Sequence, residues 1–187
     1  MASPAIENII KRFDNAEITF IGSYASIETI KYHPNTINSI VLNSSLKSLL
    51  KLTNQLSFFD IFISFRGSFK ARILKLLVNS EKKYQFNSKK FLNRHQVIKY
   101  GDFINQSLDI NYSVDSLKIY TETNEKSKTF KILGINPGAT YGSAKRWYPA
   151  EFAKVACKLS KKYDILIFGK ENEQDFANQI ELELKKK

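Results

Sequence analysis

Residues 59–86 read FDIFISFRGSFKARILKLLVNSEKKYQF and carry the clearest structural signal in the chain. The stretch opens on a short apolar run, which is typical of a buried strand. Apolar residues at helical spacing follow over 69–78, and a second candidate strand lies at 83–86. A strand, a helix and a strand joined by short connections predict two parallel strands with a crossover helix.

The same alternation continues on both sides of this stretch. Helices are predicted at 3–13, 25–32, 44–56 and 94–108, and strands at 17–22 and 39–42. Residues 1–113 are therefore predicted to form a Rossmann-like α/β domain, a parallel sheet covered by helices on both faces. A polar stretch predicts a linker over 114–128. A second, partial Rossmann-like domain is predicted over 129–187, with strands at 130–135 and 163–168 and helices at 149–162 and 172–187.

The order of these elements favours a chain cut at both ends. It opens on a helix, although parallel α/β domains usually open on a strand that packs at the sheet centre. The second predicted domain has only two strands, which is few for a stable sheet. We therefore expect the first domain to lack its first strand and the second domain to be truncated. The alternative is a domain that begins with a helix and carries a small appendage.

The composition indicates a globular protein and excludes several other classes. The chain has 187 residues, 43% hydrophobic and 25% charged, which is typical of a globular protein. Its single cysteine, Cys157, excludes an internal disulfide framework and a zinc cluster and fits a reducing compartment. No apolar run reaches the ~18 residues of a membrane-spanning helix.

The charge balance suggests an anionic partner. Lys and Arg number 29 and Asp and Glu 18, which gives a net charge of +11. A surplus of this size favours nucleic acid, anionic lipid or a phosphorylated sugar as partner. The alternative is that scattered lysines reflect only codon bias. The lack of a dense arginine block lowers the expectation of nucleic acid in particular.

One segment carries recognisable chemistry. Residues 134–152 read GINPGATYGSAKRWYPAEF and lie between a predicted strand and a predicted helix. Glycines, hydroxyl groups and two cations occur together there: Gly138, Thr140, Gly142, Ser143, Lys145 and Arg146. Glycines let a backbone approach a ligand closely, and free N–H groups at a helix start favour an anion. The segment predicts a diphosphate site, although its spacing matches neither the P-loop nor the dinucleotide fingerprint. The alternative is a solvated loop whose two cations face water.

Residues 137–147, PGATYGSAKRW, resemble the signature of the ADP-heptose:lipopolysaccharide heptosyltransferases (glycosyltransferase family 9), especially the heptosyltransferase II group. Shorter stretches match the same family in the same order, at residues 2–6, 59–70, 95–100 and 164–169. The segment around Lys145 is quite specific, and the other stretches are weak alone.

The resemblance implies the N-terminal half of a two-domain GT-B glycosyltransferase and the start of its second half. Such an enzyme moves a heptose from ADP-heptose to a heptose of the lipopolysaccharide or lipooligosaccharide inner core, with inversion of the anomeric centre. It implies ADP-heptose and a lipid A-Kdo-heptose acceptor as partners, no nucleic acid, and a cytoplasmic location peripheral at the anionic surface of the inner membrane. It implies no metal or other cofactor, and the sequence contains no Asp-x-Asp pair.

The resemblance also implies roles for particular residues. The donor diphosphate is expected at Gly138, Ala139, Thr140, Gly142 and Lys145. Lys145, with Thr140 beside it, would neutralise the charge that grows on the ADP leaving group. The acceptor is expected at Ser3, Arg66, Ser68 and Lys70. For Arg66 and Lys70 a solvated helix start remains the alternative, and His95 is more typical of a structural hydrogen-bonding residue than of a base.

No catalytic residue is predicted within the chain. The family's base is an aspartate in a Gly-Asp pair just ahead of the helix that starts here at Ser3, and this chain begins after it. Gly101 and Asp102 repeat the dipeptide inside a different helix, so the role is not transferred to them. We therefore expect little transfer by this chain alone. A basic nucleic-acid-binding module and a different nucleotide-sugar glycosyltransferase stay open as alternatives.

Overall fold

The computed structural model describes residues 1–42, 45–122, 131–139 and 143–186. The chain divides into two compact units, Met1–Thr123 and Asn124–Lys187. The first unit therefore extends past residue 113, where the sequence places the end of the first domain.

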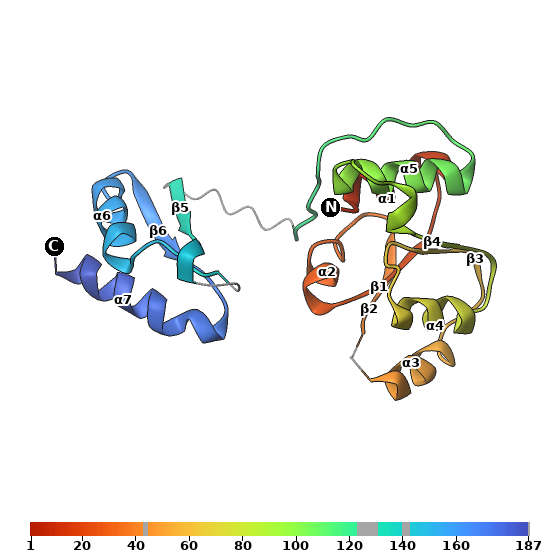
Figure 1. The fold of residues 1–187 in the computed structure, drawn as a ribbon, viewed down its shortest axis with the longest axis horizontal. Helices are drawn as coiled ribbons and strands as arrows, with labels where there is room; N and C mark the ends of the chain where they lie inside the picture. The colour runs from red at the N-terminus through yellow and green to blue at the C-terminus, as the bar shows by residue number, and fades with distance from the viewer. Residues whose placement is uncertain (43–44, 123–130, 140–142, 187) are drawn as a thin grey trace. The chain divides into compact units, whose positions relative to one another are not determined.

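The first unit alternates helices and strands as the sequence predicts (Figure 1). Its elements are α1 (Ser3–Arg12), β1 (Ile18–Gly22), α2 (Tyr24–Glu28), β2 (Thr36–Val41), α3 (Leu46–Thr53), β3 (Phe59–Ser64), α4 (Phe69–Leu77), β4 (Ser80–Gln85), the short 3-10 helix η1 (Ser88–Lys90) and α5 (Gln96–Leu108). Two helices are shorter than predicted. α2 ends before Thr29, whose hydroxyl bonds the Ser26 carbonyl at 2.8 Å and so competes with helical bonding. α3 begins only at Leu46, with Ser45 at its N-cap.

The strands of the first unit form two parallel pairs rather than the single sheet that the sequence predicts. β1 pairs with β2 and β3 with β4, and the described residues show no ladder between the two pairs. Side chains join them instead. Ile21 of β1 and Phe62 of β3 both pack against a cluster of three buried residues from α3, α4 and the α4–β4 turn: Leu49, Leu74 and Val78.

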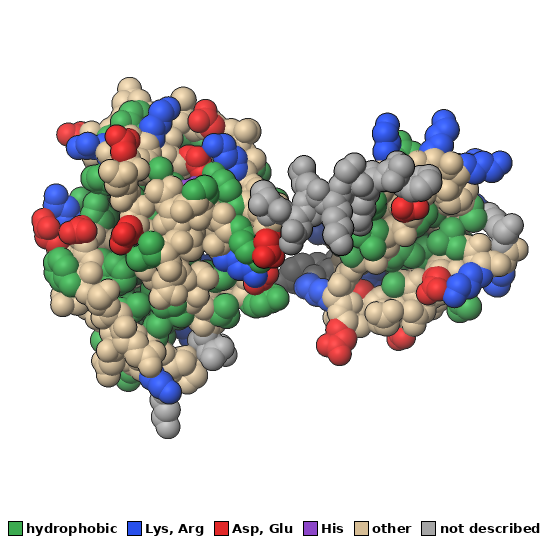
Figure 2. Space-filling model, turned by 180° about the vertical axis from the view of Figure 1, so that it is seen from behind, with side chains coloured by type: hydrophobic (Ala, Val, Ile, Leu, Met, Phe, Trp, Pro, Cys, Tyr) green, Lys and Arg blue, Asp and Glu red, His purple; other side chains and the backbone are tan. Residues whose placement is uncertain are grey.

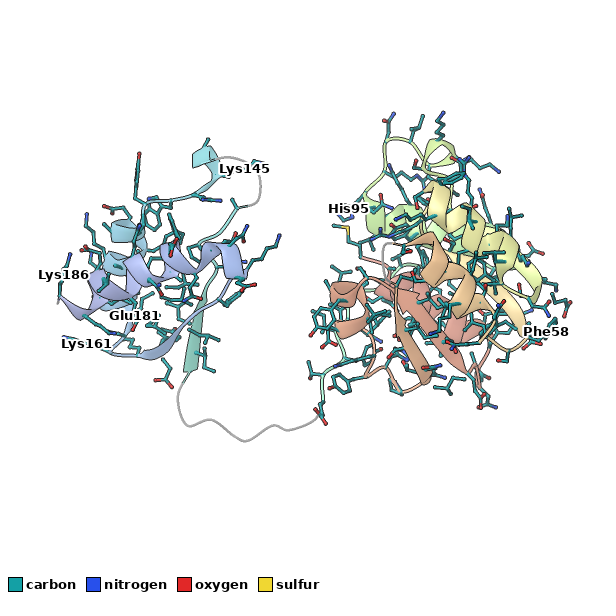
Figure 3. The ribbon with its side chains drawn as sticks, turned by 90° about the horizontal axis from the view of Figure 1, so that it is seen from below. Phe58, His95, Lys145, Lys161, Glu181 and Lys186 are labelled. Atoms are coloured by element: carbon teal, nitrogen blue, oxygen red, sulfur yellow. The ribbon has the colours of Figure 1, made fainter. Side chains whose placement is uncertain are left out.

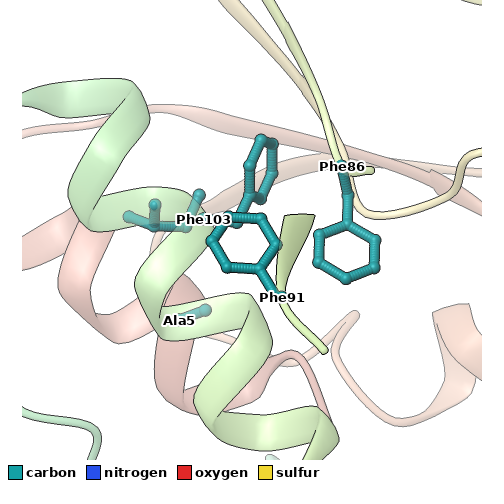
Figure 4. Packing of buried hydrophobic residues seen from close by; sticks show 5 residues of the cluster. Ala5, Phe86, Phe91 and Phe103 are labelled. Atoms are coloured by element: carbon teal, nitrogen blue, oxygen red, sulfur yellow. The ribbon is translucent and has the colours of Figure 1, made fainter. Parts of the chain in front are cut away.

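The second pair, β3–β4, is covered on both faces. The Leu49 cluster lies on one face and a larger aromatic cluster on the other, built from Ala5, Phe86, Phe91, Phe103 and Ile104 (Figure 4). The Phe86 ring stacks on Phe91 at 5.7 Å between centroids and meets the edge of Phe103 at 5.6 Å. Offset and edge-on contacts of this kind add to the free energy of simple burial. This packing confirms the predicted layering of helices on a parallel strand pair.

Residues 109–122 form no helix or strand but are attached to the first unit. Asn8 donates from Nδ2 to the Ser113 carbonyl at 3.2 Å, and the Lys118 N–H donates to Ser3 Oγ at 3.1 Å. The second bond uses the Ser3 hydroxyl, which therefore does not cap α1. Ala2 occupies the cap position without a side-chain bond, and the Ser3 hydroxyl serves the distant segment instead.

The described residues of the second unit form one parallel strand pair, two α-helices and two short 3-10 helices. Its elements are β5 (Lys131–Ile135), η2 (Ser143–Lys145), α6 (Pro149–Leu159), β6 (Tyr163–Ile167), η3 (Glu171–Glu173) and α7 (Gln174–Lys185). β5 and β6 run in register from Lys131 opposite Tyr163 to Ile135 opposite Ile167. Ile135 of the pair, Ala153 and Ala156 of α6 and Ile180 of α7 are buried. Because β5 and β6 run parallel and in register, their carboxyl ends lie at the same edge of the strand pair.

Candidate functional site

An open pocket of about 320 Å³ lies at the carboxyl ends of β5 and β6. It is lined by residues from the two loops that leave these strands: Asn136, Gly138, Ala139, Phe168, Gly169, Lys170 and Glu173. Ligands of open parallel sheets bind at this edge, because the loops that vary in sequence emerge there. Two of the predicted donor residues, Gly138 and Ala139, are thus part of the pocket wall.

Gly138 is in close contact with Glu173 across this pocket. A Cβ added at Gly138 would lie 2.1 Å from Glu173 Oε1. The other carboxylate oxygen, Oε2, accepts the Lys170 N–H at 2.9 Å and so holds the side chain across the turn before α7. The sequence predicts that a glycine here allows a close approach, and the group that approaches is a carboxylate of the same unit. Sequence reasoning did not single out Glu173, although acidic residues at a helix start are a known signal.

Arg146 closes the loop that follows β5. Its guanidinium donates from Nε and Nη2 to the Ala139 carbonyl at 3.2 and 2.8 Å. Both cations of this loop were predicted to supply positive charge to a ligand or to face water, and the structure gives Arg146 a structural bond as well. Residues 140–142 lie outside the described residues, so the predicted roles of Thr140 and Gly142 stay predictions.

Lys145 is the second cation of the loop. It ends η2, is exposed, and is labelled beside the loop in Figure 3. It is not among the residues that line the pocket. Its predicted contact with a diphosphate therefore depends on a ligand that extends out of the pocket toward η2.

The start of α6 is built for packing more than for anion binding. The Trp147 ring meets Phe152 edge-on at 5.2 Å, a contact that ties the end of the loop to α6. Pro149, the first helical residue, has no N–H, and the Glu151 N–H is bonded to the Tyr148 carbonyl at 3.0 Å. Of the free N–H groups expected to attract an anion at this helix start, mainly that of Ala150 is left.

In the first unit, three predicted acceptor residues share the β3–α4 turn. Ser68 caps α4 by accepting the Ala71 N–H at 3.4 Å, and the Arg66 carbonyl accepts from Gln85 Nε2 at 3.1 Å. Arg66, Ser68 and Lys70 are all exposed. The turn is held by backbone and cap bonds, which leaves the Arg66 side chain at the surface.

Ser3, the fourth predicted acceptor residue, does not share this setting. It lies at the start of α1, is only 8% exposed, and its hydroxyl accepts the Lys118 N–H. Little of its surface is accessible to a sugar acceptor, so the structure favours a structural role for it.

Comparison with known proteins identifies the family. Residues 50–187 match the sequence profile of glycosyltransferase family 9 (heptosyltransferase). The chain belongs to this family. It is 37% identical over 189 residues to lipooligosaccharide heptosyltransferase 2 of Campylobacter jejuni serotype O:2, a match that covers 96% of this chain and 59% of the relative. A second match, to the enzyme of the same name from Haemophilus ducreyi, is 41% identical over 54 residues, covering 28% of this chain and 16% of that protein.

Solved structures of family 9 support the fold. The Escherichia coli ADP-heptose lipopolysaccharide heptosyltransferase II matches with a TM-score of 0.69 and 16% identity, over 96% of this chain and 63% of that one. The E. coli heptosyltransferase WaaC with ADP matches with a TM-score of 0.72 and 15% identity, over 96% of this chain and 67% of that one. These matches confirm the predicted heptosyltransferase-like α/β fold. This chain spans about 60% of the length of its curated Campylobacter relatives.

Two further residues of this family 9 chain hold structural positions. His95 caps α5, and its Nδ1 accepts the Val97 N–H at 3.4 Å, which fits the structural role favoured by the sequence. Asp102, the aspartate of the repeated Gly-Asp pair, accepts a bond from Arg94 Nη1 at 2.7 Å. Its carboxylate, in the middle of α5, is thus paired with a residue that precedes the helix, which agrees with leaving the role of base unassigned to it.

The described residues form neither a metal centre nor a membrane-spanning helix. These residues contain no group of three His, Cys, Asp or Glu side chains arranged to hold a metal ion. Within the same residues, no helix combines the length and apolar character needed to cross a bilayer. On the face drawn in Figure 2, Lys and Arg side chains lie apart in small groups, whereas nucleic-acid binding favours a clustered basic surface.

Proposed function

We propose that this chain takes part in the transfer of a heptose from ADP-heptose to a heptose of the lipopolysaccharide or lipooligosaccharide inner core. The observation that carries the proposal is the β5–α6 loop, which brings Gly138 and Ala139 to the pocket at the strand ends and is closed by Arg146. Family membership supports it. The Campylobacter relatives are lipooligosaccharide heptosyltransferases, and one E. coli relative has been solved with ADP-2-deoxy-2-fluoro heptose.

On the donor side, this loop binds the diphosphate of ADP-heptose. The backbone at Gly138 and Ala139 lets the phosphates approach the strand end once the Glu173 carboxylate, which would repel them, has turned away from Gly138. Lys145 with Thr140 then neutralises the charge that develops on departing ADP. These groups supply the stabilisation of the leaving group that a metal ion supplies in other transferases. We therefore propose a reaction without a metal or other cofactor.

On the acceptor side, the exposed Arg66, Ser68 and Lys70 face the anionic, sugar-rich core. Guanidinium and ammonium groups bind the phosphates and carboxylates of such an acceptor through charge-assisted hydrogen bonds. The buried Ser3 is left out of this proposal because its hydroxyl is already bonded.

The chemistry of the transfer requires a base. In an inverting transfer an acceptor hydroxyl oxygen bonds to the anomeric carbon, the bond from that carbon to the ADP oxygen breaks, and a base takes the hydroxyl proton. Asp102 is paired with Arg94 and is not assigned this role. We propose that the chain alone transfers little heptose. Turnover with ADP-heptose and a heptose-bearing acceptor at the rate of a full-length heptosyltransferase would contradict this.

The net charge of +11 supports a location at the cytoplasmic face of the inner membrane. Each lysine near an anionic leaflet contributes about 1 kcal/mol of attraction. Association of this kind weakens as salt increases, because exposed charges are screened. Retention on anionic vesicles that does not change with ionic strength would contradict the electrostatic part of the proposal.

Calorimetry with the chain tests the donor site. ADP-heptose is expected to bind, and Lys145→Ala is expected to weaken binding about tenfold or more. Lys158→Ala, an exposed lysine at the far end of α6, is the matched control and should bind like the wild type. Equal affinity of Lys145→Ala and wild type would refute the role of Lys145.

The two alternatives are separated by different ligands. Tighter binding of another nucleotide sugar than of ADP-heptose would favour a different glycosyltransferase. Binding of short oligonucleotides with a steep dependence on salt would favour a nucleic-acid-binding module, because counterion release gives that slope.

A further inference from the structure

Helix α4 carries apolar side chains on two opposite sides. Its inner side packs on the core through Leu74, which is 6% exposed. On the other side Phe69 is 72% exposed and Leu76 is 78% exposed. These two residues are seven apart with Ile73 between them, so they lie on one stripe of the helix. A surface helix with a single packed side normally has polar residues on this outer stripe.

The charges around this stripe are all of one sign. α3 reads LKSLLKLT and α4 reads FKARILKLL, and neither contains an acidic residue. Arg72 is exposed and lies to one side of the stripe on the helical wheel, next to Leu76, with Lys75 beyond it on the same side. α3 and α4 lie beside each other in the first unit (Figure 1). The outer face of α4, defined as Phe69, Arg72, Ile73 and Leu76, is thus apolar with a basic border.

We propose that the outer face of α4 is the surface by which this protein docks on an anionic lipid bilayer. This inference rests on the peripheral membrane association proposed above and names the residues that make the contact. Phe69 and Leu76 enter the boundary between headgroups and acyl chains, where an interfacial helix buries its apolar side. Arg72 and Lys75 keep their aliphatic stems on that boundary and pair their charged ends with lipid phosphates.

The position of Phe69 links this docking to the acceptor site. It follows directly on the β3–α4 turn, one residue after Ser68 and three after Arg66. Docking through Phe69 therefore places the exposed Arg66 side chain at the lipid surface. A sugar acceptor that is anchored in the bilayer by acyl chains presents its first sugars at that level, so docking and acceptor recognition use adjacent residues.

Co-sedimentation of the chain with vesicles tests the proposal. Vesicles of phosphatidylethanolamine and phosphatidylglycerol are compared with vesicles of phosphatidylcholine, at low and high salt. The Phe69→Ser/Leu76→Ser variant is expected to lose about tenfold or more of the partitioning onto anionic vesicles, because two large apolar side chains no longer enter the bilayer. Leu92→Ser/Ile119→Ser removes two apolar residues that are 67% and 71% exposed elsewhere in the same unit, and should partition like the wild type.

The basic border has its own variant. Arg72→Gln/Lys75→Gln keeps both apolar anchors and should lower binding at low salt while leaving the salt-resistant fraction in place. Equal circular-dichroism melting curves for all variants would show that loss of binding is not loss of folding.

Each contrary outcome identifies which proposal is wrong. If Phe69→Ser/Leu76→Ser partitions like the wild type, the docking face is wrong and peripheral association stands. If the wild type binds no anionic vesicle, both membrane proposals are wrong, whereas calorimetry with ADP-heptose still reports the donor site. If the wild type is a dimer in ultracentrifugation and Phe69→Ser/Leu76→Ser is a monomer with unchanged vesicle binding, a second copy covers this face and the docking proposal is overturned.

Discussion

Tyr120 donates its phenolic hydroxyl to the carboxylate of Glu7 and thereby fixes the segment after α5 to helix α1. The same carboxylate accepts from Lys118 Nζ at 2.9 Å and lies 3.1 Å from His33 Nε2. The Asn35 N–H donates to His33 Nδ1, so the ring proton is on Nε2 and points at Glu7. One carboxylate thus joins α1, the turn before β2 and residues 118–120.

Replacing Glu7 by Gln is expected to destabilise the first unit by about 1 kcal/mol or more. The amide keeps the size of the side chain but has one acceptor oxygen and no charge for Lys118. Thermal unfolding followed by circular dichroism measures the effect. Glu28→Gln breaks a partly exposed ion pair with Lys31, three residues further along the chain, that joins no distant segments; it is the control and should change stability much less. Equal melting temperatures for the Glu7 variant and the wild type would contradict the joining role.

The same cluster predicts how stability depends on pH. Burial raises the pKa of Glu7, but hydrogen bonds from its three partners outweigh burial and hold the pKa below the ordinary value of 4.5. The stability that this group contributes is therefore complete above pH 4.5 and is lost as the pH falls through the lower folded-state pKa. Burial and the Glu7 carboxylate also raise the pKa of Tyr120 to about 12. Its contribution is complete below the ordinary value of 10.0 and is lost as the pH rises through about 12.

Urea unfolding of wild type and Glu7→Gln across this range measures both effects. The difference in unfolding free energy between the two proteins should shrink at the acidic end. A difference that stays constant from neutral pH to below the folded-state pKa of Glu7 would contradict the assignment.

Gly138→Ala is expected to disturb the pocket of the second unit. The new methyl group would collide with the Glu173 carboxylate, so that carboxylate must leave its bond with the Lys170 N–H. Because the group that collides is the end of a flexible side chain and can turn away, we expect a loss of only about 1 kcal/mol in stability, together with weaker ADP-heptose binding. Glu173→Ala should remove most of the added cost in stability, so a double-mutant cycle measures the contact directly. Additive effects of the two changes would show that they do not touch.

Arg146→Lys separates charge from loop geometry. Lysine keeps the positive charge but does not reproduce the two bonds that a guanidinium directs from Nε and Nη2 to the single Ala139 carbonyl oxygen. Affinity for ADP-heptose, measured by calorimetry, should fall about tenfold because the loop loses its closing contact. Arg12→Lys, on the exposed end of α1, serves as the control. If Arg146→Lys binds the donor as the wild type does, Arg146 acts only through its charge.

Local patterns were sufficient for most of the fold. The apolar run at Phe59–Ser64 and the helical spacing over Phe69–Leu77 predict β3 and α4 because period and burial are local properties. The sequence predicts a linker over 114–128, because the stretch is polar and lacks clear periodicity, whereas residues 114–122 are bonded to the first unit. Their order comes from polar bonds to Ser3 and Glu7, more than 100 residues away in the sequence. No local pattern encodes such a pairing.

The site was predictable only in part for the same reason. Gly138 and Lys145 share a motif, which makes the loop recognisable. Glu173 follows a different strand and reaches Gly138 only because β5 and β6 pair in parallel and end at one edge. The bond from Arg146 to the Ala139 carbonyl was not predictable either. The sequence alone does not distinguish a loop cation that binds a ligand from one that binds a carbonyl of its own loop.

Gly101 is a position where replacing a helix glycine by alanine, which usually stabilises a protein, is expected to destabilise it. It lies in the middle of α5, where glycine costs about 1 kcal/mol relative to alanine in helix propensity. A Cβ at this position would lie 2.2 Å from Val114 Cγ2. The Val114 side chain therefore packs in the space that a methyl group at residue 101 would fill. Gly101→Ala would raise the helix propensity of α5 but displace the segment around Val114 that packs on it, so the protein would be less stable.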